Sequence, residues 1–122
     1  EKIKNIKLPV SAPFHCELMS NATEEMKKEF EKISFKKSNN ILISNVTADR
    51  VLQPDDLKSL LINQIEKRVR WRESIINMIK YGVDHFIEIG PGKVLSGLIK
   101  RIDKNVKITS INNQSDIESL KI

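Results

Sequence analysis

Apolar residues recur along most of the chain at the spacing of amphipathic helices. From residue 17 to just past residue 32 they return every three or four positions, at Leu18, Ala22, Met26, Phe30 and Ile33. Similar stripes begin at Pro54, near Trp71 and at Val94. Proline followed by two carboxylates favours a helix start at Pro54, and Gly82 favours the end of the helix that begins near Trp71. The pattern predicts helices over these four stretches and a short polar helix near the chain end.

Three short apolar runs predict strands between these helices. The run from Ile41 to Ser44 shows no alternation, which is typical of a strand covered on both faces, as in a parallel sheet. The other two runs are His85 to Ile89 and Lys107 to Ile111. Helices alternating with strands predict an α/β fold that amounts to half of a doubly wound, mostly parallel sheet.

Length and composition suit one globular unit or part of one. The chain has 122 residues, of which 39% are hydrophobic and 30% charged. No apolar run approaches the roughly 20 residues of a membrane span, and none opens the chain as a secretory signal would. A single cysteine, Cys16, excludes an internal disulfide, so we expect a reducing cytoplasm. Since the first residue is Glu1, we also expect a processed chain or a piece of a longer one.

The net charge of +5 favours acidic partners without naming one, because the charges are scattered along the chain. No aromatic residues alternate with basic ones as in a single-strand nucleic-acid surface, so nucleic acid is not favoured. No spacing of His, Cys and carboxylate residues resembles a metal site. No serine lies in a Gly-x-Ser-x-Gly elbow, which argues against a serine nucleophile within these residues.

His15 is the first candidate for chemistry. Pro9 and Pro13 stiffen an extended approach to it, and a helix is predicted to begin just after it. A side chain at such a junction can project into a cleft, where a neutral imidazole can accept and return a proton. A surface or capping histidine is the alternative. Cys16 beside it is better explained as a small apolar residue than as a catalytic thiol, since chain neighbours rarely present their side chains to one another.

Gln64 is the second candidate, because it places an amide on the otherwise apolar face of the helix that begins at Pro54. A buried amide needs hydrogen-bond partners. It could bind a backbone group in the core. It could also lie beside His15, where its carbonyl oxygen would decide which imidazole nitrogen holds the proton. The pattern leaves both possibilities open.

The segment Gly90-Pro91-Gly92-Lys93 joins a predicted strand to a predicted helix, and a helix start presents backbone N–H groups that attract anions. The segment matches neither the P-loop nor the dinucleotide fingerprint. We therefore expect these glycines to provide a tight turn and close packing of strand on helix rather than a phosphate site. His85 is expected to begin or cap a strand.

Three segments in order resemble one family. They are residues 8–19 with Pro13-Phe14-His15, residues 45–48 with the letters NVTA, and residues 83–98 with the letters EIGPGK. Together they resemble the malonyl-CoA:acyl carrier protein transacylases, which are acyltransferases of fatty acid synthesis. The resemblance runs from about Leu8 to the end of the chain.

The resemblance implies an enzyme that moves a malonyl group from coenzyme A to acyl carrier protein, with malonyl-CoA as substrate and no cofactor. It implies that His15 is the catalytic base, which accepts the proton of an attacking serine and then helps the carrier's thiol take the acyl group. Gln64 falls on the position whose carbonyl accepts a hydrogen bond from that histidine. Phe14 is similar to the aromatic residue that lines the acyl pocket and disfavours branched acyl groups.

Parts of the family pattern are missing from these residues: the serine in its Gly-His-Ser-Leu-Gly elbow, the oxyanion-hole glutamine, and the arginine that pairs with the malonyl carboxylate. The chain resembles the last two-fifths of such an enzyme. Residues 1–10 would be the last strand of a small ferredoxin-like subdomain, and residues 11–122 the C-terminal part of a large α/β-hydrolase-like subdomain.

We therefore expect a chain that is inactive alone and that needs a complementary N-terminal half or associates with itself. Its implied partners are acyl carrier protein, which is acidic in this family, and a coenzyme A thioester. Two alternatives are a non-catalytic α/β module that binds an anionic ligand or nucleic acid at the Gly90 to Lys93 turn, and a decayed gene product without activity.

Overall fold

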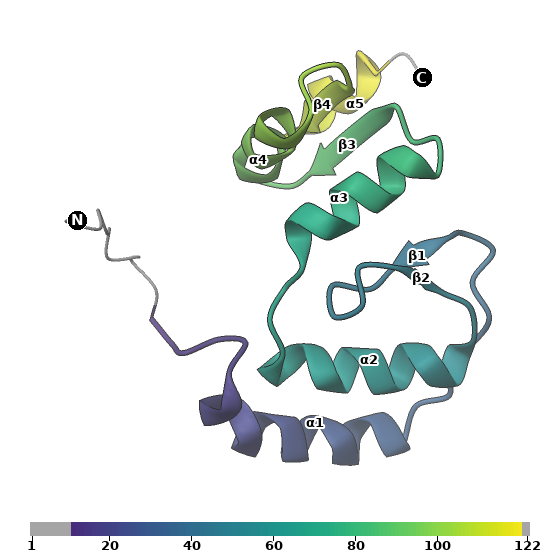
Figure 1. The fold of residues 1–122 in the computed structure, drawn as a ribbon, viewed down its shortest axis with the longest axis vertical. Helices are drawn as coiled ribbons and strands as arrows, with labels where there is room; N and C mark the ends of the chain where they lie inside the picture. The colour runs from purple at the N-terminus through teal and green to yellow at the C-terminus, as the bar shows by residue number, and fades with distance from the viewer. Residues whose placement is uncertain (1–10, 121–122) are drawn as a thin grey trace. The chain divides into compact units, whose positions relative to one another are not determined.

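A computed structural model describes residues 11–120 of the chain (Figure 1). The chain divides into two compact units, Glu1–Val69 and Arg70–Ile122. The segment expected to be the last strand of a ferredoxin-like subdomain, residues 1–10, lies outside the described residues. The predicted boundary at residue 10 therefore stays a prediction.

Two packed helices dominate the first unit (Figure 1). A 3-10 turn, η1 (Glu17–Met19), leads into α1 (Ser20–Glu31), and α1 packs against α2 (Pro54–Glu66). The helix predicted over residues 17–32 is confirmed, except that its first three residues form the tighter 3-10 turn. The predicted start of α2 is confirmed as well, with Pro54 in the first turn and two aspartates after it.

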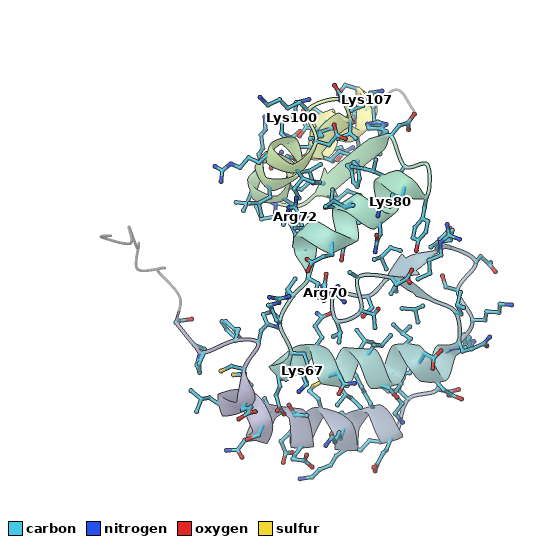
Figure 2. All side chains as sticks on the ribbon, in the orientation of Figure 1. Lys67, Arg70, Arg72, Lys80, Lys100 and Lys107 are labelled. Carbon is cyan, nitrogen blue, oxygen red and sulfur yellow. The ribbon has the colours of Figure 1, made fainter. Side chains whose placement is uncertain are left out.

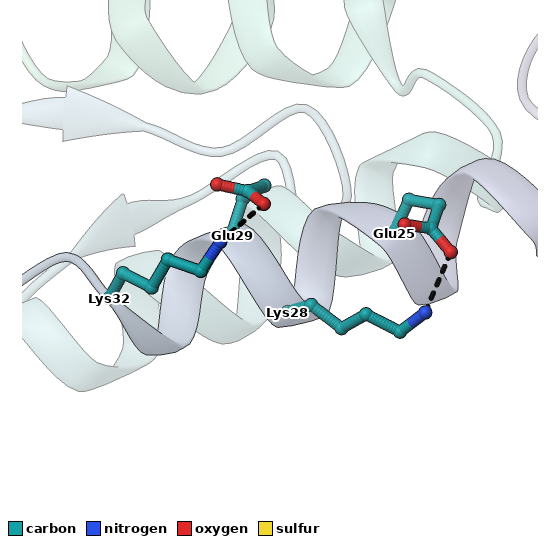
Figure 3. A network of polar contacts seen from close by, with 4 residues as sticks. All are labelled: Glu25, Lys28, Glu29 and Lys32. Carbon is teal, nitrogen blue, oxygen red and sulfur yellow. Dashed lines mark hydrogen bonds and ion pairs between the residues drawn. The ribbon is translucent and has the colours of Figure 1, made fainter.

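The outer face of α1 carries a row of ion pairs at i, i+3 spacing. Glu25 with Lys28 and Glu29 with Lys32 each lie 2.7 Å apart, nitrogen to oxygen (Figure 3). Their side chains are mostly exposed, and pairs of this kind contribute about 0.3–0.5 kcal/mol each. This face is therefore a solvated helix surface rather than a site.

A two-stranded antiparallel sheet follows α1. Strand β1 (Leu42–Ile43) pairs with β2 (Arg50–Val51), and Leu42 lies opposite Val51. The prediction of a strand covered on both faces in a parallel sheet is wrong for the described residues, because Ile41 is 70% exposed and the strand direction is antiparallel. The reason is the turn at residues 44–49, since so short a connection can join only antiparallel strands.

The second unit is a β-α-β arrangement with helices at both ends (Figure 1). Its elements are α3 (Trp71–Lys80), β3 (His85–Ile89), α4 (Val94–Ile102), β4 (Lys107–Ile111) and α5 (Gln114–Glu118). β3 and β4 run parallel, in a register from His85 opposite Lys107 to Ile89 opposite Ile111. All five elements lie where the sequence predicts them, and Gly82 follows α3 with φ +93°, as its predicted role requires.

The core of the second unit is an apolar cluster made by Ile75, Phe86, Ile99 and Val106. These residues come from α3, β3, α4 and the approach to β4, so the cluster ties the elements of this unit together. The α/β fold class is confirmed. None of the helices within residues 11–120 is long and apolar enough to cross a membrane.

Candidate functional site

His15 lies at the junction that leads into η1, and its backbone is unusual. Its φ is +60°, in the left-handed region that residues other than glycine rarely adopt. Holding such a conformation costs about 1 kcal/mol or more, and residues that do so are frequent at functional sites. The side chain is exposed. The structure therefore presents the imidazole at a strained bend on the surface of the first unit.

The imidazole is held by the C-terminal end of α2. His15 Nδ1 lies 2.7 Å from the main-chain carbonyl oxygen of Gln64. Carbonyls in the last turn of a helix lack an intrahelical N–H partner, so this oxygen is open to a side-chain donor. Because a carbonyl oxygen only accepts, Nδ1 carries the hydrogen of the neutral ring. Nε2 is then left with a lone pair that can accept a proton.

The side chain of Gln64 makes a separate contact. Its Oε1 accepts a hydrogen bond from Asn45 Nδ2 at 3.2 Å. The hypothesis that the side-chain oxygen of Gln64 holds the imidazole is therefore wrong. The two residues do meet, but through the main-chain oxygen, as the resemblance implies for a carbonyl at this position. Asn45 was not predicted to take part, and the one signal for it was its place at the start of the NVTA segment.

The imidazole borders a small apolar pocket. The cavity measures about 200 Å³ and is lined by Phe14, His15, Met19, Leu61, Gln64 and Ile65. Phe14 is 58% exposed, so its ring flanks the opening rather than filling the core. An apolar recess beside one proton acceptor suits an uncharged reacting group such as a thioester.

The contacts of Cys16 indicate a structural role and not a catalytic one. Its Sγ donates to the carbonyl oxygen of Pro13 at 3.1 Å, and the residue is half-buried. The thiol thus helps to close the loop that holds His15. No group of three or more His, Cys, Asp or Glu residues in the described part of the chain could hold a metal ion.

Several backbone donors of the Gly90 to Lys93 turn and of the helix start that follows it are occupied. The carboxylate of Glu88 accepts the N–H groups of Leu95 at 3.0 Å and Ser96 at 2.8 Å, and Asn112 Oδ1 accepts that of Gly92 at 2.7 Å. Hydrogen bonding by the side chain and main chain of Ser96, and by the N–H of Leu95, lowers the pKa of Glu88 below its ordinary value. A carboxylate of the protein thus stands where an anionic ligand would bind, which weighs against the anion-binding alternative.

The glycines of this turn serve its backbone shape. Gly90 and Gly92 have φ of +140° and +93°, which confirms the predicted tight turn. The expected close packing of strand on helix is wrong within residues 11–120, because a Cβ added to either glycine or to Gly97 would meet no atom within 4 Å. His85 begins β3, as predicted, and its Nε2 lies 2.8 Å from Thr109 Oγ1 on β4.

Comparison with known proteins identifies relatives of this chain, although no protein-family model matches it. The sequence is 44% identical over 113 residues to the malonyl CoA-acyl carrier protein transacylase of Bacillus subtilis (strain 168), and 40% identical over 111 residues to that of Staphylococcus aureus (strain COL). These matches cover 93% and 91% of this chain but 36% of each relative. The chain therefore spans about a third of the length of the curated relatives it matches.

Solved structures agree with the sequence matches. A malonyl CoA-acyl carrier protein transacylase from Clostridium perfringens superposes with a TM-score of 0.86 at 47% identity, over 93% of this chain and 36% of that one. A malonyl-transacylase in complex with a type II PKS acyl-carrier protein superposes with a TM-score of 0.85 at 31% identity, over 92% and 36% of the two chains. In sequence and in fold, this chain is a partial counterpart of the malonyl CoA-acyl carrier protein transacylases, in keeping with the C-terminal portion that the resemblance predicts.

Proposed function

We propose that this chain supplies the general base for the transfer of a malonyl group from coenzyme A to acyl carrier protein. The nucleophile is a serine on a segment outside these 122 residues. His15 Nε2 takes the proton of its hydroxyl as the serine oxygen attacks the thioester carbonyl. The departing coenzyme A thiolate takes that proton from the ring. The carrier's thiol then gives its own proton to Nε2 and attacks the acyl-serine, and the ring returns this proton to the serine oxygen as that oxygen leaves. Malonyl-CoA is the acyl donor, and the proposal invokes no cofactor.

The observation that carries the proposal is the 2.7 Å hydrogen bond between His15 Nδ1 and the main-chain oxygen of Gln64. It leaves Nε2 as the proton acceptor and directs the ring beside the apolar pocket. The bond persists when the ring is protonated, because Nδ1 remains a donor in both states. The imidazole can therefore keep one orientation while the proton arrives and leaves, as a residue that acts first as base and then as acid requires.

Phe14 is proposed to line the acyl site. It directly precedes His15 and borders the same pocket, with its ring more than half exposed. A bulky ring at this place would leave room for an unbranched acyl group and crowd a branched one. We include selectivity for malonyl over branched acyl groups in the proposal.

A complementary segment that bears the serine is proposed to cover the second unit. Apolar side chains lie exposed on β3 and on the first turns of α4: Ile87, Ile89, Val94, Leu95 and Leu98. Ile89 is 79% exposed and Val94 72%. Parallel strands are normally covered on both faces, and an apolar surface of this kind is typical of an interface. Self-association through the same surface is the other outcome.

A basic groove of the second unit supports an acidic carrier protein as partner. The groove measures about 460 Å³, and no carboxylate is among its lining residues in the described chain. Besides Val106 and Ile108, it is lined by three lysines and two serines: Lys93, Lys100, Lys107, Ser96 and Ser110. Lys100 lies on α4 and Lys107 on β4 (Figure 2). The positive groove and the net charge of +5 would both attract an acidic surface. The lone Cys16 suits a reducing cytoplasm, where we place the reaction.

The test is reconstitution from two chains. Transfer from malonyl-CoA to acyl carrier protein is measured for this chain, for a chain carrying the serine-bearing remainder of the B. subtilis relative, and for their mixture. We expect turnover from the mixture only, because the nucleophile and the base lie on different chains. A mixture that forms a complex but shows no turnover would overturn the proposal. Turnover by this chain alone would contradict the need for a complement.

A further inference from the structure

We propose that Asn45 is a positioning residue for the base, and that it acts through the side chain of Gln64. This inference rests on the proposed function of His15. Gln64 makes two contacts with different groups: its main-chain oxygen accepts from His15, and its side-chain Oε1 accepts from Asn45 Nδ2. The residue that orients the imidazole is thereby held in turn by the loop between β1 and β2.

The last turn of a helix is where this restraint matters. Helix ends fray, because their carbonyls lack intrahelical partners. In α2 the carbonyl oxygen of Asn63 accepts the N–H of Lys67 at 2.9 Å, while that of Gln64 meets the imidazole. Without a restraint on its side chain, Gln64 would follow the motion of this turn, and its carbonyl would point at Nδ1 for less of the time.

The loop that carries Asn45 is rigid enough to act as the support. Ser44 N–H donates to Asp49 O at 2.9 Å, and Ala48 N–H donates to Ser44 O at 2.8 Å. Ser44 Oγ accepts the N–H of Val46 at 3.1 Å. Ala48 is fully buried and has φ +60°, a conformation that persists only where the surroundings enforce it. These contacts bracket Asn45 on both sides of the loop, so its amide has a defined position.

The chain of contacts explains a polar residue on an apolar helix face. Gln64 and Asn45 are half-buried, and each satisfies part of the other's hydrogen-bonding capacity. An apolar side chain at position 64 would leave the main-chain oxygen in place but would lose the link to the loop. The side-chain amide of Gln64 therefore serves to orient the main-chain carbonyl of the same residue, and it does not contact the imidazole itself.

The experiment reads the tautomer of His15 by ¹⁵N NMR of the labelled chain, at a pH where the ring is neutral. The chain has two histidines, so His85→Gln assigns the signals. We expect the Nδ1–H form to predominate in the parent chain. Asn45→Ala and Gln64→Met should each lower the ratio of the Nδ1–H to the Nε2–H form by about two- to fivefold. The double variant should match the single variants, because both remove the same link.

Matched variants separate positioning from general loosening. Asn63→Ala removes an exposed amide from the same helix turn and should leave the ratio unchanged. Asn45→Asp should restore the parent ratio, since the amide of Gln64 can turn over and donate to the carboxylate.

Several outcomes would overturn the inference. One is a folded Asn45→Ala chain with the parent ratio. Another is a double variant with a larger effect than either single change. If Asn45→Ala fails to fold, Gln64→Met decides the matter, and a parent ratio in that folded chain would count against the inference. A parent chain in the Nε2–H form would contradict the proposed base itself, so the two failures are distinguishable.

Discussion

The C-terminal end of α2 and the N-terminal end of α4 treat their unpaired backbone groups in opposite ways. At the end of α2, the carbonyl of Gln64 receives a hydrogen bond from His15, whose second nitrogen remains open beside a pocket. At the start of α4, Glu88 accepts the N–H groups of Leu95 and Ser96 and completes the helix from within the chain. The end of α2 is a candidate site because the side chain bound to it, His15, keeps a second nitrogen free to react. The start of α4 is not, because both oxygens of Glu88 are used as acceptors.

The same difference separates the two segments that the sequence offers as candidates for chemistry or ligand binding. The Gly90 to Lys93 segment has glycines just before a helix start, but the N–H groups of Gly92, Leu95 and Ser96 already donate to side chains of the protein. The segment that ends at His15 has no familiar ligand-binding spacing, yet it presents a free base. The sequence already favours His15 over this turn, and counting donors and acceptors gives the physical reason.

Removing each histidine in turn tests whether the end of α2 holds a catalytic base. In the reconstituted mixture, His15→Ala should lower the rate of malonyl transfer by about 10³- to 10⁶-fold, because the serine loses its base. His85→Ala is the matched control. It removes the bond to Thr109 on β4 but none of the residues that line the pocket, so the rate should change little. Equal losses in the two variants would mean that His15 has no special role.

Glycine substitutions test whether the Gly90 to Lys93 turn needs glycine for its backbone conformation. Gly92→Ala places a side chain at φ +93° and should lower the free energy of unfolding by about 1–2 kcal/mol. Gly97→Ala lies within α4, where the added methyl group meets no atom within 4 Å. It should raise the free energy of unfolding by about 0.5–1 kcal/mol. Trp71, the single tryptophan, belongs to the second unit and reports the transition by fluorescence in urea.

If Gly92→Ala lowers the free energy of unfolding and Gly97→Ala raises it, the backbone conformation, and not a lack of space, requires glycine at position 92. A neutral Gly92→Ala would mean that the turn tolerates other backbone shapes. In that case the glycines would need another explanation.

Local signals made most of the fold predictable. Helices with a clear apolar stripe and a terminal proline or glycine, such as α2 and α3, lie where the sequence places them. The pairing of β1 with β2 could not be predicted, because each strand has only two residues and its partner is decided by the turn at residues 44–49.

The site was predictable as a pair of residues but not as a set of atoms. Every residue carries a main-chain carbonyl, so no pattern of side chains reveals that the backbone of Gln64 is the acceptor. The contact of Asn45 with Gln64 joins residues 19 positions apart. The contacts of Glu88 with Leu95 and Ser96 join residues 7 and 8 positions apart. Only the folded chain brings such groups together.

The smallest expected effect concerns the charge of Glu88. Its pKa is lowered in the folded state by hydrogen bonds from Ser96 and Leu95, so the ionised carboxylate stabilises the fold. This contribution is fully present above the ordinary pKa of a glutamate and is lost as the pH falls through the lowered pKa of the folded state. Glu88→Gln should therefore lower the melting temperature slightly near pH 7, and the difference from the parent chain should vanish in acid.

Thermal melts followed by circular dichroism from about pH 7 to pH 3 measure this difference. Glu118→Gln is the control, because it removes the same charge from α5 without touching the start of α4. Near neutral pH, the melting temperature of Glu118→Gln should differ from that of the parent chain by less than the melting temperature of Glu88→Gln does. If the Glu88→Gln difference stayed constant down to the lowest pH, the carboxylate would act through shape rather than charge. The contrast between the two helix ends would then rest on the geometry of Glu88 and not on its charge.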